Sequence, residues 1–245
     1  MIRRILAILP GNWRRSLRLQ QRFLSDCLRG EVFRLLSRNG ARTPWPAVLS
    51  VEQRIAPGPA LEAKLHNMQL AIKPLQNLDV PPGKVLSFWK LVGNPSQKRG
   101  FQPGRNIIKG QLVHDFGGGL CQLSSAMYEL ALRAGITGAE RHAHSTNVYT
   151  PQTSYTMLGL DATLAYGYKD LRLANNTAVP FNFSFELSRT RICVRLHAPE
   201  PLPDLPLRVQ HNENPDGLTA KVFRQSNPDE QLLTTDFYWA WKEEV

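Results

Sequence analysis

Three consecutive glycines, residues 117–119, stand directly before the segment Leu-Cys-Gln-Leu-Ser-Ser-Ala-Met-Tyr, and this junction constrains the fold more than any other part of the chain. A run of glycines interrupts regular structure and allows close approach of neighbouring backbone. From Leu120 onward, apolar residues recur every three or four positions until Gly135, which predicts an amphipathic helix that begins immediately after the glycines. Cys121 is therefore predicted to lie in the first turn of that helix.

A cysteine in the first turn of a helix is well placed to act as a nucleophile. The unpaired N–H groups and the helix dipole at this end favour the thiolate form. Further along the chain, the sequence Glu-Arg-His-Ala-His-Ser supplies two imidazoles. A helix with cysteine at its start, then histidine, then a polar orienting residue is the chain order of papain-like cysteine peptidases. On this analogy of arrangement the catalytic residues are Cys121 as nucleophile, His144 as base and Asp161 as orienter, with His142 and Asp170 as the alternatives.

The same turn can also hold an anion without doing chemistry. Backbone N–H groups at a Gly-rich turn and a helix N-terminus bind carboxylate or phosphate groups. Under this interpretation the ligand-binding residues are Gly117, Gly118, Gly119, Gln122, Ser125, Arg141 and His142. In a third interpretation the motif is purely structural, with Asp161 capping a turn and Arg141 paired inside the protein.

Four segments together resemble the VanW family, which is named for an accessory protein of vancomycin-resistance operons. They are PPGKVLSFWKLVGNPSQKRGF, GGGLCQLSSAMYELALRAGI, ERHAHS and LDATLAYGYKDLRLANNT, in this order within residues 50–245, with Leu86 where the family usually has Phe. The resemblance favours His144, which matches the family's His-Ser pair. It implies a glycopeptide-resistance and cell-wall context and assigns no reaction. Our preferred interpretation is recognition of a peptide or anionic cell-wall precursor, and the alternative is a cysteine-dependent hydrolase or acyltransferase.

Positive charge is concentrated in the first 45 residues. They contain ten arginines and two acidic residues, whereas the rest of the chain is close to neutral. Residues 12–39 are predicted to form an amphipathic helix with leucines on one face and Arg15, Arg18, Arg22 and Arg29 on its flank. Such a helix either lies on an anionic membrane surface or docks on the domain through its leucine face. Nucleic-acid binding is disfavoured, because no recognition module and no aromatic platform accompanies the arginines.

Cysteine spacing and the N-terminal residues bear on the compartment. Cys27, Cys121 and Cys193 are widely separated and form no CxxC pair, which favours a reducing compartment and predicts neither a metal site nor a cofactor. Residues 1–10 are too short to span a bilayer and lack the pattern of a secretory signal. We therefore expect a cytoplasmic protein, peripheral at the inner membrane face.

The remaining pattern predicts the domain organisation. Residues 1–45 are expected to form a basic arm and linker, and residues 46–245 one domain that ends in a hairpin around Asn-Glu-Asn-Pro-Asp-Gly. Short alternating segments dominate after Gly135, which is typical of strands. The predicted class is α+β, with a single, predominantly antiparallel sheet packed on the motif helix.

Overall fold

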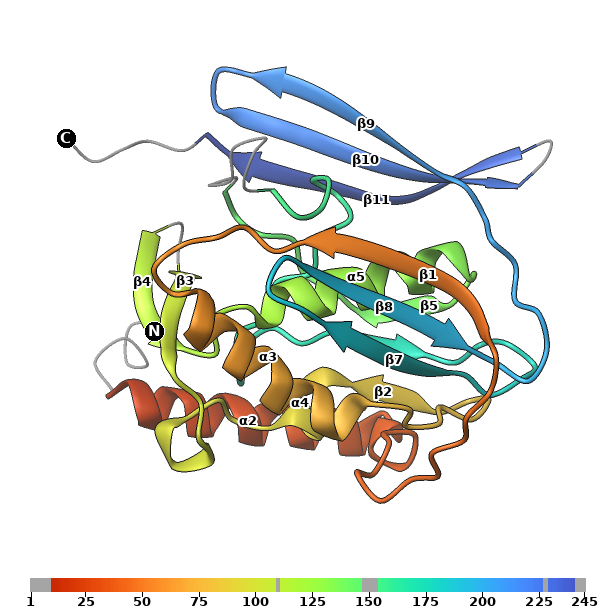
Figure 1. Ribbon diagram of the computed structural model, residues 1–245, viewed down its shortest axis with the longest axis horizontal. Coiled ribbons are helices and arrows are strands. Elements are labelled where there is room, and N and C mark those ends of the chain that lie inside the picture. The colour runs from red at the N-terminus through yellow and green to blue at the C-terminus, as the bar shows by residue number, and fades with distance from the viewer. Residues whose placement is uncertain (1–9, 109–110, 147–153, 227–228, 241–245) are drawn as a thin grey trace.

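The fold is organised around the helix that follows the glycines. The computed structural model describes residues 10–108, 111–146, 154–226 and 229–240 (Figure 1). Helix α5 (Leu120–Arg133) begins directly after Gly119, as the sequence predicts. Gly119 has φ +94°, and a Cβ atom on it would lie 2.7 Å from Cγ of Lys64. Only glycine fits this junction without a shift of its neighbours, so the turn and the helix α3 (Leu61–Leu75) determine each other's position.

The α+β class is confirmed, but the single predicted sheet is wrong. Across the described residues the strands form three three-stranded sheets and one hairpin, and neighbouring strands in each of them run antiparallel. The first sheet has the strand order β1 (Ala47–Arg54), β8 (Arg191–His197), β7 (Asn182–Leu187), and the second has the order β2 (Val85–Ser87), β6 (Arg172–Ala174), β5 (Thr137–Glu140). The third sheet has the order β11 (Asp229–Trp239), β10 (Gly217–Ser226), β9 (Leu207–Asn214). The hairpin consists of β3 (Pro103–Ile108) and β4 (Gln111–Phe116).

Burial of α5 explains why one sheet is not enough. Eleven of its residues are buried, including the polar residues Gln122, Ser124 and Ser125. A helix that is buried on nearly all sides needs cover from several directions. Strands β1 and β8 supply one cover, β5 a second and α3 a third (Figure 1). The three-residue strands β2 and β6 belong to a separate small sheet and do not extend the sheet that contains β1 and β8.

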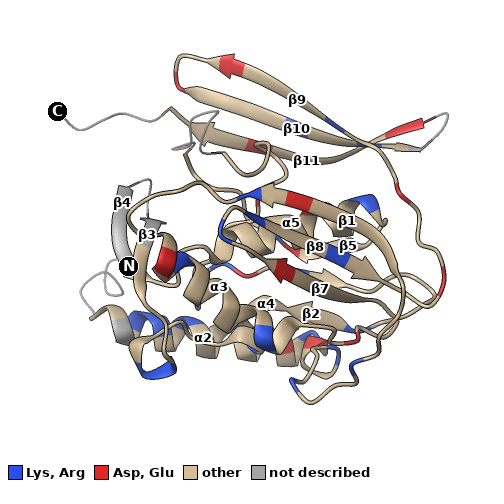
Figure 2. Cartoon of the chain, viewed as in Figure 1, with Lys and Arg blue, Asp and Glu red and all other residues tan. Residues whose placement is uncertain are grey.

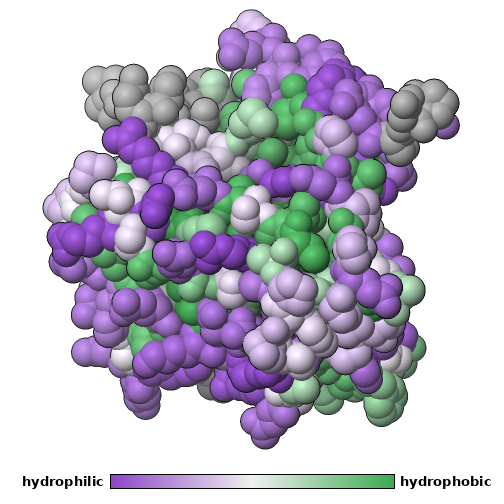
Figure 3. Space-filling view, turned by 45° about the vertical axis from the view of Figure 1, so that its right-hand side comes forward, coloured by the Kyte–Doolittle hydropathy of each residue, from purple (hydrophilic) through white to green (hydrophobic). Residues whose placement is uncertain are grey.

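The predicted C-terminal hairpin forms as strands β9 and β10, which pair from Gly217 opposite Asn214. Strand β11 adds a third strand on the other side of β10. This sheet lies over one end of the molecule, where Leu207, Val209 and Val222 belong to the apolar cluster of the main core. Hydrophobic side chains are visible on the surface where this sheet meets the body (Figure 3).

The N-terminal helix forms but is shorter than predicted, and its charged face contacts the domain. Helix α2 (Gly11–Leu28) ends before Gly30, whose φ of +68° is incompatible with a continued helix, and a 3-10 turn, η1 (Glu31–Phe33), follows. Docking through the leucine face is wrong: Leu24 and Leu28 are 60% and 89% exposed, and the charged face contacts the domain instead. Helix α4 (Phe88–Val92) and the 3-10 turn η2 (Gln97–Arg99) complete the helical elements of the described residues.

Candidate active site

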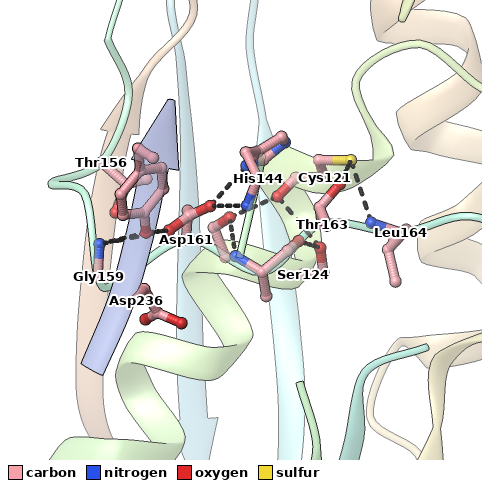
Figure 4. Close-up of polar contacts among 12 residues, drawn as sticks. Cys121, Ser124, His144, Thr156, Gly159, Asp161, Thr163, Leu164 and Asp236 are labelled. Carbon is pink, nitrogen blue, oxygen red and sulfur yellow. Dashed lines mark hydrogen bonds and ion pairs between the residues drawn. The ribbon is translucent and has the colours of Figure 1, made fainter. Parts of the chain in front are cut away.

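Cys121 lies in the first turn of α5, partly exposed, with its sulfur among polar groups. The backbone N–H of Leu164 donates a hydrogen bond to Sγ at 3.4 Å, and the hydroxyl of Thr163 lies 3.8 Å from it. Both residues belong to the segment that passes in front of the helix end (Figure 4). The thiol is thus surrounded by donors, an environment that favours the thiolate.

His144 stands between Cys121 and Asp161 (Figure 4). Its Nδ1 lies 2.6 Å from Oδ2 of Asp161, and the same oxygen accepts the backbone N–H of His144 at 2.7 Å. With Nδ1 held in this way, the other ring nitrogen remains for the thiol of Cys121, whose pKa is coupled to that of His144. The structure thus places His144 against Asp161, and near enough to Cys121 for thiol and imidazole to shift each other's pKa values.

The pKa values of the three groups are shifted in the directions a thiolate–imidazolium pair requires. Burial raises the pKa of the Cys121 thiol, but the hydrogen bond to His144 and its positive charge outweigh burial and bring it below the usual value. Burial lowers the pKa of His144, yet hydrogen bonds to Asp161 and Cys121 raise it to about 9. Burial raises the pKa of Asp161, and the interaction with His144 brings it down to about 2. Both shifts favour transfer of the thiol proton to the imidazole.

Asp161 is held from its other side by three further donors. Its Oδ1 accepts hydrogen bonds from the hydroxyl of Tyr238, from the guanidinium of Arg141 at 3.1 Å and from the N–H of Gly159 at 3.3 Å. The Tyr238 hydroxyl in turn accepts the Gly159 N–H at 2.7 Å. Asp161 is 2% exposed, so each of these donors compensates for the loss of water around a buried carboxylate.

Several predicted ligand-binding residues have their polar groups occupied within the protein. Gln122 donates to the backbone oxygen of Arg54, and Ser125 donates to the oxygen of Cys121 and accepts from the N–H of Ala162. These contacts hold the helix start against β1 and against the Asp161 segment. Two of the three glycines that precede the helix, Gly117 and Gly119, have positive φ.

The charged residues near His144 are also engaged. Arg141 is buried, forms ion pairs with Asp161 and Asp236, and lies over the ring of Tyr128. Nε2 of His142 contacts Oε1 of Glu140 at 3.0 Å. The alternative orienter, Asp170, accepts bonds from the Ser87 hydroxyl and the Trp89 N–H, so it belongs to another part of the core.

Two lysines near the glycine turn and the thiol are not predicted from the sequence: Lys64 lies against Gly119, and Lys169 interacts electrostatically with Cys121. Lys64 packs against Gly119, and burial lowers its pKa to about 8. Burial also lowers the pKa of Lys169, while the negative charges of Cys121 and Asp161 act in the opposite direction. Neither ammonium group has a carboxylate partner in the described part of the chain. Isolated lysines carry no sequence signal, so only the fold reveals them.

Comparison with known proteins assigns the family. Residues 63–197, more than half of the chain, match the family model described as VanW like protein. The chain belongs to the VanW family. The segment that matches VanW contains Cys121, His144 and Asp161, whereas Tyr238 and all of α2 lie outside it.

Two curated relatives extend this result. The vancomycin B-type resistance protein VanW of Enterococcus faecalis (strain ATCC 700802 / V583) is 30% identical over 137 residues, which are 56% of this chain and 50% of that protein. The uncharacterized protein YoaR of Bacillus subtilis (strain 168) is 33% identical over 119 residues, 49% of this chain and 38% of that protein. The match thus spans half or less of each VanW relative. No solved structure matches the chain significantly.

Proposed function

We propose that this chain is a cysteine-dependent acyl hydrolase or acyltransferase that acts on a peptide or amide. The single observation that carries the proposal is the relay from Cys121 through His144 to Asp161, with 2.6 Å between Nδ1 and Oδ2. Buried aspartate, imidazole and thiol in this order are the parts of an activated nucleophile. The lowered pKa of the thiol supports the same conclusion.

In the first half of the reaction the Cys121 thiolate attacks the carbonyl carbon of the substrate. A C–S bond forms, and the carbonyl electron pair moves to oxygen as a tetrahedral oxyanion. The backbone N–H of Cys121 is available there, because it donates to no acceptor within the described residues. Collapse of the oxyanion breaks the C–N bond, and the imidazolium of His144 gives its proton to the leaving nitrogen.

In the second half His144 is neutral and acts as a base. It removes a proton from water, or from the amine or hydroxyl of an acceptor, whose oxygen or nitrogen attacks the thioester carbonyl. The C–S bond breaks, and the thiolate–imidazolium pair is restored. Asp161 retains its charge throughout, holding Nδ1 of His144 and stabilising the imidazolium.

The substrate class follows from the family and from the two lysines. The name of the enterococcal relative refers to vancomycin resistance, so we propose a peptide of a cell-wall precursor. Lys64 and Lys169, which lack internal carboxylate partners, favour a substrate with a carboxylate near the reacting carbonyl. The second candidate function is recognition of such a precursor without turnover, which the same lysines and the Gly-rich turn would support.

The experiment that tests the proposal is acylation of a protein whose only cysteine is Cys121. A Cys27→Ser, Cys193→Ser variant is incubated with p-nitrophenyl acetate and with synthetic peptidoglycan stem peptides. We expect a burst of nitrophenol, an acetyl group on Cys121 by mass spectrometry, and cleavage or transfer products from at least one peptide. The matched control retains only the exposed Cys27, and it should show neither burst nor peptide product.

A Cys121→Ala variant separates the two candidate functions. If the protein is an enzyme, Cys121→Ala should lose all turnover, while calorimetry should show unchanged peptide binding. Binding is retained because the substitution alters neither the backbone nor the two lysines. Equal peptide binding in both proteins, together with no acylation and no product from the parent, would instead establish recognition alone.

A further inference from the structure

Helix α2 is attached to the domain by its charged face. The guanidinium of Arg22 contacts both carboxylate oxygens of Glu140, at 3.0 and 2.5 Å. On the same face, Asp26 forms a two-fold contact with Arg172 at 2.7 and 2.8 Å. These groups are at most 27% exposed, so water competes weakly for them. The ion pairs determine which side of α2 faces outward.

The outward side of α2 is apolar. Counting along the helix at 3.6 residues per turn places Trp13, Leu17, Leu24 and Leu28 on one side, opposite Arg22 and Asp26. The exposed fractions of the four apolar residues are 63%, 36%, 60% and 89%. Phe33, in the turn that follows, is 80% exposed. We call these five residues the outer face; such a contiguous exposed group usually marks an interaction surface.

Arginines flank the outer face, and the acidic residues nearby are already paired. Arg14, Arg18 and Arg29 have no carboxylate partner among the residues that the structure describes. Asp26 is bound to Arg172 and Glu31 to Arg34, so neither is free to neutralise them. Figure 2 shows the basic bands along α2. The outer face is therefore hydrophobic at its centre and positive at its edge.

We propose that the outer face binds the surface of an anionic lipid bilayer, with α2 lying parallel to it. Trp13 and the leucines would enter the interface, and the flanking arginines would contact phosphate groups. A second copy of the chain fits less well, because it would place one arginine-rich edge against another. No helix within the described residues has the length and apolar character to cross a bilayer.

The test is co-sedimentation of the full chain with two kinds of vesicle, one of phosphatidylcholine alone and one with added phosphatidylglycerol. We expect binding to the anionic vesicles only, weakened by salt. The Leu24→Ser, Leu28→Ser variant should lose it. Each of Arg14→Gln, Arg18→Gln and Arg29→Gln should weaken it about fivefold, the equivalent of about 1 kcal/mol per charge at the membrane surface.

Matched controls use exposed residues elsewhere on the surface. Leu232→Ser removes a leucine that is 50% exposed, and Arg189→Gln removes an exposed arginine; both should leave vesicle binding unchanged. Light scattering of the parent and the double leucine variant reports the oligomeric state. The proposal is overturned if the parent does not bind anionic vesicles, if the control variants lose binding equally, or if the leucine variant only converts a dimer to a monomer.

Discussion

Oδ2 of Asp161 accepts two hydrogen bonds from the same residue, one from Nδ1 of His144 at 2.6 Å and one from its backbone N–H at 2.7 Å. Two bonds to one oxygen fix both the ring and the main chain of His144. The imidazole therefore cannot rotate away from the thiol without breaking contacts in a buried environment. The structure holds the base in place before any substrate binds.

The first prediction concerns the pH dependence of thiol reactivity. In the chain with Cys121 alone, alkylation by iodoacetamide should rise with pH around a midpoint well below the value of about 8.5 for an ordinary thiol. Asp161→Asn should move that midpoint upward, because the imidazolium loses its partner. Turnover should fall again above about pH 9, as His144 loses its proton. A midpoint that Asp161→Asn leaves unmoved would refute the relay.

The second prediction concerns Tyr238, which supports Asp161 from the C-terminal sheet. Tyr238→Phe removes one donor to Oδ1 and the acceptor of the Gly159 N–H. We expect a loss of about 1–3 kcal/mol in the free energy of unfolding, as for other unsatisfied buried groups. The alkylation midpoint should shift less than in Asp161→Asn, since Arg141 remains. Urea denaturation measures the first effect, and an unchanged stability would count against the bond.

The third prediction concerns the glycine turn. Gly119→Ala places a Cβ atom 2.7 Å from Cγ of Lys64 at a φ of +94°. The conformational cost of a left-handed alanine alone is about 1–2 kcal/mol, and the clash adds to it. Gly58→Ala is the control, because nothing lies within 4 Å of its added Cβ. Thermal unfolding should show a clear loss for the first variant and almost none for the second.

The fourth prediction concerns Lys64 and substrate charge. Lys64→Met should raise KM roughly 10–100-fold for a peptide with a free carboxylate, the usual range for a hydrogen bond to a charged group. The corresponding peptide amide should be affected little. In the parent, preference for the acid over the amide should decline as pH rises through about 8, where Lys64 loses its proton. Equal effects on both peptides would remove Lys64 from substrate binding.

The fifth prediction concerns Glu140, to which α2 is attached. Burial raises the pKa of Glu140, but His142 and Arg22 bring it from 4.5 down to about 2. Because the folded-state pKa is depressed, the stabilisation is present above about pH 4.5 and is lost as pH falls through about 2. Glu140→Gln should cost about 2–3 kcal/mol at pH 7 and progressively less in acid. Glu52→Gln, which breaks an exposed pair with Arg191, should cost less than about 1 kcal/mol.

Local patterns in the sequence were sufficient for the glycine turn, for α5 and for the position of Cys121, because caps and helical periodicity act between near neighbours. Chain order indicates His144 as base and Asp161 as orienter, and the family resemblance favours His144; the fold brings Asp161 into contact with His144. The division into several sheets, Tyr238 and Lys64 were not predicted. Their places depend on pairings between distant segments, which leave no periodic signal.

Which face of α2 contacts the domain could not be predicted from the sequence, for a related reason. An amphipathic pattern shows that a helix has an apolar face and a charged face. It does not show which of the two faces contacts the domain when the charged face can form ion pairs. Here two carboxylate–guanidinium pairs, Arg22 with Glu140 and Asp26 with Arg172, outweigh the usual burial of leucines.

The attachment of α2 also imposes an order on synthesis. Arg22 precedes Glu140 by 118 residues, and Asp26 precedes Arg172 by 146. While a ribosome is still making the core, α2 has already emerged and has no partner for its charged side. Strand β1 is likewise synthesised long before β8, the strand with which it pairs. For most of translation, therefore, a basic amphipathic helix precedes an unfinished domain, and a nascent chain can meet its first binding surface before it has folded.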